Sequence, residues 1–340
     1  MEKNKRVTIK DIAREAGVSI CTVSHVINKT HYVSPALTDR VNKAIEKHNY
    51  RMDFSASSLR KKVSKMIGII IPNSSSQFFA LLTKYIENFS REIGYHVVIC
   101  NSDYNTDIEI EHIEALITRN IDGIIMIPVS EDIKCYRNIF ELDTPFVFVE
   151  RKLEGTNCNS VMSFSQDSIA QVIDHLVSLG HKKIAYIGRE KDLLHHKIRF
   201  NSFADSMKRH NLELKEEYII YGANYRFKDG YEDMSKLLDV KDQPTAVLVF
   251  NDVLAIGAIQ AIKDRGYKVP GDFSIVGFDN IEIGNYIEPS LTSITTMKEQ
   301  ISKVAFDLLI NKINNKNIRK KHVFIKTEVV MRKSTGAAKK

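Results

Sequence analysis

Apolar residues at helical spacing mark three short segments near the start of the chain. They recur three or four positions apart, which places them on one face of a helix. The pattern predicts a helix that begins after Thr8, a second over residues 20–28 and a third from Pro35 to about His48. The apolar positions are Ile9, Ile12, Ala13 and Ala16 in the first helix, Val23, Val26 and Ile27 in the second, and Leu37, Val41, Ala44 and Ile45 in the third.

Local signals indicate where these helices begin and end. Thr8 and Asp11 have the spacing of a capping box, and Gly17 can end the first helix in a left-handed conformation that costs other residues more. Ser19 can cap the second helix, whose positions 21, 22 and 25 face outward. Two helices joined by a tight turn and followed by a third predict a helix-turn-helix unit, in which the second helix reads DNA. The alternative is an ordinary three-helix bundle.

From Met66 the pattern changes to apolar runs that alternate with amphipathic segments. The runs predict strands over 66–72, 95–103, 122–128, 144–151, 181–188, 245–250 and 273–279, with helices near 78–93, 108–119 and 133–142. Continuous apolar strands between helices are typical of parallel α/β sheets covered on both faces. A second series of such units begins near residue 160, so the sequence predicts two lobes with a cleft between them.

Charge is unevenly distributed along the 340 residues. Residues 1–65 hold 14 Lys and Arg against 6 Asp and Glu, whereas residues 66–310 are net acidic. A basic head on an acidic body is expected where only the head contacts phosphates. Between them, in residues 51–65, Leu59 is followed directly by three basic residues. An apolar side chain among cations is typical of proteins that insert a wedge into the minor groove, although an ordinary linker is the alternative.

Polar residues follow several predicted strands, at 73–77, 101–103, 150–151, 251–252 and 279–280. In open parallel sheets, ligands bind at the carboxyl ends of the strands, so these loops predict a ligand site.

No catalytic motif, metal-ligand spacing or cofactor motif is present, and we expect neither an enzyme nor a bound cofactor or metal. The pair His195-His196 is interpreted as part of a surface loop. Four widely spaced cysteines suit a reducing compartment, and the N-terminus lacks an apolar export segment, which predicts a cytoplasmic location.

The chain resembles the lactose-repressor/galactose-repressor family of bacterial transcription regulators over nearly its full length. The head matches in VTIKDIAREAGVS and TVSHVIN, and the hinge matches in ASSL. The body matches in MIGIIIPNSSSQFF, GYHVVICNSD, DGIIMIP, DSIAQVIDHLVSLGHKKIAYIG, RFNSFADSMKRHNL, PTAVLVFNDVLAIGAIQAIKDRGYKVPGDFSIVGFDN, EPSLTSI and MRKST.

This resemblance implies an all-α helix-turn-helix head on an α/β body with two lobes of the type I periplasmic-binding-protein kind. The implied segments are a head at 1–50, a hinge at 51–64, a first lobe from 65–160 and 293–321, a second lobe from 161–292 and 322–335, and a disordered tail at 336–340. The family also implies a homodimer on a near-palindromic operator. Assembly of dimers into tetramers remains open, although the C-terminus shows no leucine heptads.

Carried over by position, the resemblance implies that Ile20, Cys21 and His25 read bases. Family members often have arginine where His25 stands, and histidine cannot grip a guanine with the same two-pronged contact. The other implied DNA contacts are Thr8, Ser19, Thr22, Ser24, Asn28 and Tyr32 in the head, with Ala56, Leu59 and Arg60 in the hinge.

The resemblance also implies an effector site between the lobes. Its residues would be Asn73, Gln77, Phe78, Phe79, Arg151, Arg199, Tyr225, Asn251 and Asp279. An aromatic platform with charged and amide groups suits a sugar, a sugar phosphate or a sugar acid. The function implied is an effector-controlled repressor of carbohydrate-metabolism genes. The alternatives are a non-catalytic sugar-binding transport protein, which would lack the basic head, and a purine-responsive regulator that depends on a corepressor.

Overall fold

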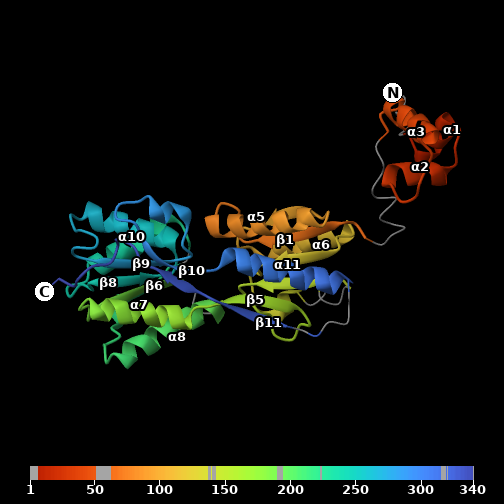
Figure 1. Cartoon of the computed structure of the whole chain (residues 1–340). Helices are drawn as coiled ribbons and strands as arrows, with labels where there is room; N and C mark the ends of the chain where they lie inside the picture. Colours follow the sequence, from red (N-terminus) through yellow and green to blue (C-terminus); the bar gives the residue numbers. More distant parts are fainter. Residues whose placement is uncertain are drawn as a thin grey trace, which may run out of the picture. The chain divides into compact units, whose positions relative to one another are not determined.

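The computed structural model describes residues 7–50, 63–136, 139, 143–189, 194–222, 224–314, 319 and 321–339. The chain divides into two compact units, Met1–Ser64 and Lys65–Lys340, which we call the head and the body (Figure 1). The predicted hinge contacts Ala56, Leu59 and Arg60 lie outside the described residues.

The head contains the three predicted helices, α1 (Ile9–Ala16), α2 (Ile20–Asn28) and α3 (Pro35–Lys47). They enclose a small core in which Ile12, Val23 and Val41 are fully buried. The capping box is present, since the backbone N–H of Thr8 donates to Asp11 Oδ2 over 2.9 Å. The predicted turn is present too, with Gly17 in the left-handed region at φ 61°.

The first lobe of the body is a six-stranded parallel sheet in the order β11-β5-β4-β3-β1-β2 (Figure 1). Its strands are β1 (Met66–Ile71), β2 (His96–Asn101), β3 (Gly123–Met126), β4 (Phe146–Val149), β5 (Asn159–Phe164) and β11 (His322–Lys326). Helices α5 (Gln77–Glu92) and α11 (Lys298–Asn314) pack on one face, and α6 (Thr106–Thr118) packs on the other. The predicted helix at 133–142 is described only as a short 3₁₀ helix, Ile133–Tyr136.

The second lobe repeats this plan in the order β12-β10-β9-β8-β6-β7, with only β12 antiparallel to its neighbour. Its strands are β6 (Ile184–Arg189), β7 (Ile219–Gly222), β8 (Ala246–Val249), β9 (Ser274–Phe278), β10 (Thr292–Thr295) and β12 (Glu328–Val330). Helices α9 (Phe227–Leu238) and α10 (Asp252–Asp264) cover one face, and α7 (Gln166–Ser178) and α8 (Leu194–Arg209) cover the other. Short 3₁₀ helices occupy Glu216–Tyr218 and Glu282–Asn285.

The contact between α9 and α10 depends on two glycines. A Cβ at Gly257 would lie 1.9 Å from the carbonyl oxygen of Phe227, and one at Gly230 would lie 2.1 Å from that of Leu254. Because these obstacles are backbone atoms, only glycine allows the two helices to approach so closely.

Strand pairing corrects the lobe boundaries expected from the sequence. Residues 161–164 belong to β5 and 322–326 to β11, and these two strands pair with each other in the first lobe. Residues 293–295 instead pair with β9 and β12 in the second lobe. Residues 322–331 therefore contribute a strand to each sheet, and the chain crosses between the lobes at Thr327.

The predicted disordered tail is also corrected, because its described part packs on the second lobe. The Gly336 N–H donates to Ser274 Oγ over 3.0 Å, and the Ala338 N–H donates to the carbonyl oxygen of Leu179 over 2.9 Å. Lys339 Nζ lies 2.6 Å from Asp272 Oδ1.

Candidate functional sites

Helix α2 presents a polar outer surface because its apolar side faces the core of the head. Ser19 caps it by accepting a hydrogen bond from the Thr22 N–H over 3.0 Å. At the first turn Ile20 is 41% exposed and Cys21 is exposed, so both can contact a partner. Tyr32, just beyond the helix, is 89% exposed.

Hydrogen bonds in and next to α2 hold two other predicted DNA contacts, Asn28 and His25. Asn28 Nδ2 donates to the Ser24 carbonyl oxygen over 2.9 Å. His25 Nε2 lies 3.1 Å from Cys21 Sγ, and His25 Nδ1 lies 2.9 Å from Thr30 Oγ1. Thr8, by contrast, uses its hydroxyl to donate to Asp11 over 2.6 Å, so its side chain completes the cap of α1.

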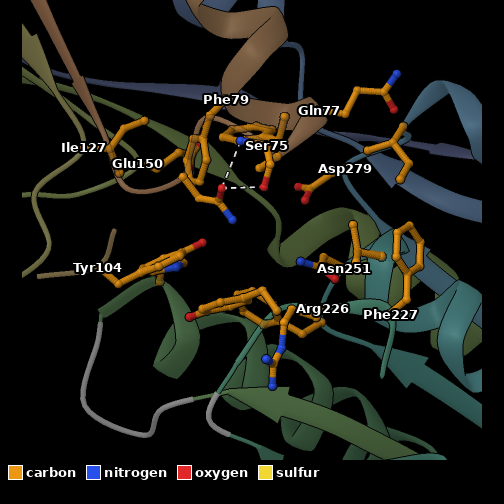
Figure 2. Close-up of a pocket in the computed structure, with 18 of the residues that line it drawn as sticks. Ser75, Gln77, Phe79, Tyr104, Ile127, Glu150, Arg226, Phe227, Asn251 and Asp279 are labelled. Carbon is orange, nitrogen blue, oxygen red and sulfur yellow. Dashed lines mark hydrogen bonds between the residues drawn. The ribbon is translucent and has the colours of Figure 1, made fainter. Parts of the chain in front are cut away.

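A cavity of about 520 Å³ lies between the two lobes of the body, and side chains from both lobes surround it (Figure 2). All nine predicted effector contacts line it: Asn73, Gln77, Phe78, Phe79, Arg151, Arg199, Tyr225, Asn251 and Asp279. Most of them follow the carboxyl ends of β1, β4, β8 and β9, the edge of a parallel sheet where ligands bind. The cavity volume is within the usual range for small-molecule sites.

Aromatic rings form much of the cavity wall. Tyr104 of the first lobe stacks on Tyr225 of the second, with ring centroids 5.3 Å apart and planes 17° apart. Phe78 and Phe79 meet edge to face at 5.2 Å. These rings offer flat apolar surfaces to a ligand.

Arg199 of α8 is buried in the cavity wall. Its Nη1 donates to the Phe250 carbonyl oxygen over 2.9 Å, and its guanidinium lies 3.5 Å from the centroid of the Phe278 ring. Burial raises the pKa of the Asp279 carboxyl, whereas the nearby Arg199 and Lys298 charges act in the opposite direction. Arg199 therefore partly compensates a buried carboxylate.

Glu150, His195 and Tyr104 also line this cavity, although they were not among the predicted effector contacts. Glu150 Oε2 accepts a hydrogen bond from Ser163 Oγ over 2.7 Å, while Glu150 Oε1 is buried without a partner among the described residues. Arg151 Nε and His195 Nδ1 are also buried without a hydrogen-bond partner in the described part of the chain. Three unsatisfied polar atoms in one wall favour a ligand that can bond to them.

Burial shifts the pKa values of Glu150 and His195. It raises the pKa of the Glu150 carboxyl, and it holds the pKa of His195 well below its ordinary value, with His196, Arg151 and Arg199 adding to the effect. The interpretation of His195-His196 as a surface loop is therefore wrong, since His196 is only 3% exposed and lies in α8. In the sequence, the one indication that Glu150 belongs to the site is its position directly after the strand that ends at Val149.

Two residues of the same wall have an unusual backbone conformation. Glu150 has φ 57° and Asp279 has φ 96°, in the left-handed region that side-chain-bearing residues rarely adopt. Strain of this kind is concentrated at binding sites, where the surrounding structure holds it in place.

Two hydrogen bonds join the lobes at the rim of the cleft. The Glu282 N–H donates to Gln77 Oε1 over 2.9 Å, and the Leu194 N–H donates to Glu131 Oε2 over 2.8 Å. Together with the Tyr104–Tyr225 stack, they connect the two lobes around the cavity.

A helix-turn-helix head and a two-lobed body with a cavity lined by aromatic and charged side chains define the class of ligand-responsive DNA-binding regulators. The family model "Bacterial regulatory proteins, lacI family" matches residues 8–53, and "Periplasmic binding protein-like domain" matches residues 173–335. The HTH-type transcriptional repressors PurR of Mannheimia succiniciproducens and Pasteurella multocida are each 34% identical to the chain, over 96% of its length and 98% of theirs. The chain belongs to the lacI family of bacterial regulatory proteins.

Solved structures agree with this assignment. The lac repressor dimer bound to operator and the anti-inducer ONPF superposes with a TM-score of 0.86 at 25% identity, covering 98% of this chain and 100% of that one. A LacI family regulator of Enterococcus faecium with bound ribose has a TM-score of 0.72 at 25% identity, over 81% of this chain and 100% of its own. The CelR–cellobiose complex, at 23% identity, shares the fold with a TM-score of 0.73 over 97% of this chain and 100% of its own.

These findings confirm the predicted fold class and the prediction of a DNA-binding transcriptional regulator rather than an enzyme. Within the described ranges, no helix is long and apolar enough to cross a membrane. The same residues contain no cluster of His, Cys, Asp and Glu that could hold a metal ion.

Proposed function

We propose that this protein is a cytoplasmic repressor of carbohydrate-metabolism genes. It binds a near-palindromic operator as a dimer and is controlled by a small molecule in the cavity between its lobes. The observation that carries the proposal is the convergence of all nine predicted effector contacts on one cavity of about 520 Å³. The operator-bound lac repressor dimer, which superposes over 98% of this chain, supports the dimer and the DNA partner.

The cavity favours a sugar or a sugar derivative as the effector. Aromatic faces suit the apolar side of a pyranose or furanose ring, while Arg199, Asp279, Arg151 and Glu150 can bond to hydroxyl groups. The two carboxylates balance Arg151 and Arg199, and the third arginine of the lining, Arg226, is paired with Asp229, so an uncharged sugar fits at least as well as a phosphorylated one. The ribose and cellobiose complexes of similar proteins support this class of ligand.

A purine is the second candidate effector. The PurR repressors are 34% identical to this chain over 96% of its length, and the stacked rings Tyr104 and Tyr225 would suit a flat base. We place the purine second because the polar atoms of the cavity wall belong largely to charged side chains. Such side chains suit the several hydroxyl groups of a sugar better than the few polar atoms of a base.

Coupling would operate through the lobes, because ligand contacts come from both of them. A ligand shifts the equilibrium only if it binds one lobe arrangement more tightly than another. The Gln77–Glu282 hydrogen bond and the Tyr104–Tyr225 stack are contacts that such a rearrangement would change. We also propose that residues 51–64 transmit the change in lobe arrangement to the head. The expected response is induction, in which the effector releases the operator, rather than corepression.

The test combines DNA selection with a metabolite panel. Selecting operators from a random DNA pool should return a near-palindromic consensus, and one sugar, sugar phosphate or purine should change the affinity of that DNA in a fluorescence anisotropy assay. Absence of any sequence preference would refute the regulator, and a preference that no metabolite alters would refute the sensor. A purine response without a sugar response would establish the second candidate.

Leu59→Ala separates DNA binding from effector binding. If Leu59 inserts into the minor groove, the substitution should weaken the selected operator while leaving effector affinity, measured by calorimetry, unchanged. An equal loss of both affinities would contradict the proposed role of this hinge residue.

A further inference from the structure

The DNA-reading surface of α2 contains a histidine that is held at both ring nitrogens. His25 Nε2 lies 3.1 Å from Cys21 Sγ, one helical turn earlier. His25 Nδ1 lies 2.9 Å from Thr30 Oγ1, beyond the end of the helix. His31 packs edge-on against the same ring, with centroids 4.5 Å apart and planes at 84°. The imidazole is thus fixed on three sides.

The end of the helix explains why Thr30 can reach His25. Lys29 ends α2 in the left-handed region at φ 52°, which reverses the chain direction directly after Asn28. The reversal returns Thr30 to the outer surface of α2, where its hydroxyl meets the ring of His25. Thr30 itself is exposed, so this hydroxyl contributes nothing to the core of the head.

The chemistry of neutral imidazole makes these two contacts interdependent. One ring nitrogen donates and the other accepts, so the partner at one nitrogen sets the role of the other. If Nδ1 donates to the Thr30 hydroxyl, Nε2 accepts from the Cys21 thiol, and the sulfur presents lone pairs outward. In the opposite tautomer Nε2 donates to the sulfur, and the thiol hydrogen is directed elsewhere. Whether His25 Nδ1 donates to the Thr30 hydroxyl or accepts from it therefore decides whether Cys21 offers a base its sulfur lone pairs or its thiol hydrogen.

We infer that Thr30 is a specificity-determining residue of the head that acts by positioning His25, and through it Cys21. This inference rests on the proposed function, since it presupposes that α2 reads an operator. Cys21 and His25 then form one reading unit, which contacts bases through the sulfur and the outer edge of the ring. Such a unit does not make the two-pronged guanine contact of an arginine. Substitution of Thr30 should change base preference although the side chain itself reads no base.

The experiment is operator selection from a random DNA pool with the full-length protein and a set of matched variants. Thr30→Val keeps the shape of the side chain but removes the hydroxyl, and Thr30→Ser keeps the hydroxyl. Thr38→Val makes the same chemical change on α3, where the hydroxyl donates to the Val33 carbonyl oxygen. His25→Ala alone and combined with Thr30→Val completes the set.

The expected result is a local change in specificity. Thr30→Val should lower the discrimination among bases about fivefold, as expected for one lost hydrogen bond, and only at the positions that His25→Ala also alters. Thr30→Ser and Thr38→Val should keep the original preference. In the His25→Ala background, Thr30→Val should have no further effect, because the residue acts through the ring.

Three results would overturn the inference. They are an unchanged preference in Thr30→Val, an equal loss of affinity for all sequences, or the same Thr30→Val effect with and without His25. A wild-type protein that selects no sequence at all would instead refute the proposed function, so the two failures are distinguishable.

Discussion

Replacing Glu150 by glutamine should make the body more stable and the effector site weaker. The carboxylate is buried, its Oε1 has no partner among the described residues, and its Oε2 accepts from Ser163. Glutamine has the same shape and can keep the Ser163 bond while removing a charge from a buried site. Removing one buried, incompletely bonded charge is worth about 1–3 kcal/mol. In a domain of this size that free energy raises the melting temperature by roughly 2–4 °C per kcal/mol.

The effect should depend on pH in a defined direction. Because burial raises the pKa of Glu150, the folded protein favours the protonated form, and the resulting stability is complete below the ordinary carboxyl pKa. It is lost as the pH rises through the raised value. The Glu150→Gln variant should therefore gain most over the wild type at pH 8 and least at pH 4.

The assays are thermal unfolding across this pH range and calorimetry with the effector found in the metabolite panel. Losing the carboxylate should weaken effector binding by roughly 10–100-fold, the usual worth of a hydrogen bond to a charged group. Glu111→Gln, an exposed position on α6 of the same lobe, is the control and should change neither measurement. A lower melting temperature for Glu150→Gln at pH 8, or an unchanged effector affinity, would refute this reasoning.

Three further predictions concern pH, packing and the DNA-reading surface. Burial raises the pKa of Asp252 to about 7, so its contribution to stability should fall between about pH 4 and pH 7, and Asp252→Asn should lessen that pH dependence in melting curves. Unlike Glu150→Gln, it should also lower stability throughout, because both Asp252 oxygens accept hydrogen bonds, from Ser293 and the Ile281 N–H, and an amide nitrogen cannot accept; a variant as stable as the wild type would contradict this. Gly257→Ala should cost at least 1–3 kcal/mol, measured by denaturant unfolding, because its methyl group would overlap the Phe227 carbonyl; an unchanged midpoint would contradict the close approach of the two helices. Bound operator DNA should slow alkylation of the Cys21 thiol, followed by mass spectrometry, while the exposed Cys135 of the body reacts as before; equal rates at Cys21 with and without DNA would argue against its place in the interface.

The head could be predicted almost completely from the sequence because its signals are local. The Thr8–Asp11 capping box, the left-handed Gly17 and the Ser19 cap each act within one turn of the residues that they organise. The same holds for the seven predicted strands of the body, which match β1–β4, β6, β8 and β9, whereas β5, β7 and β10–β12 were not predicted by range. All nine effector candidates also reached one cavity, because the resemblance carried information about the whole fold.

The errors arose where long-range pairing decides the outcome. The resemblance placed residues 322–335 in one lobe, but long-range pairing divides them at Thr327: residues 322–326 pair with β5 of the first lobe, and residues 328–330 pair with β10 of the second. Similarly, Glu150 and His195 are buried because two lobes meet around them, which neither side chain's neighbours in sequence reveal. The tail through Ala338 is ordered by contacts with Leu179, about 160 residues earlier in the chain.

The division of the last strands between the lobes has a consequence for how this protein is made. Strands β11 and β12 each occupy an outer edge of one sheet, and both come after all the other strands in chain order. Until they arrive, β5 and β10 are left with bare hydrogen-bonding edges that invite association with other chains. A product truncated before residue 322 would lack an edge strand in both lobes. A ribosome that stalls there therefore releases an aggregation-prone fragment rather than a protein with one working lobe.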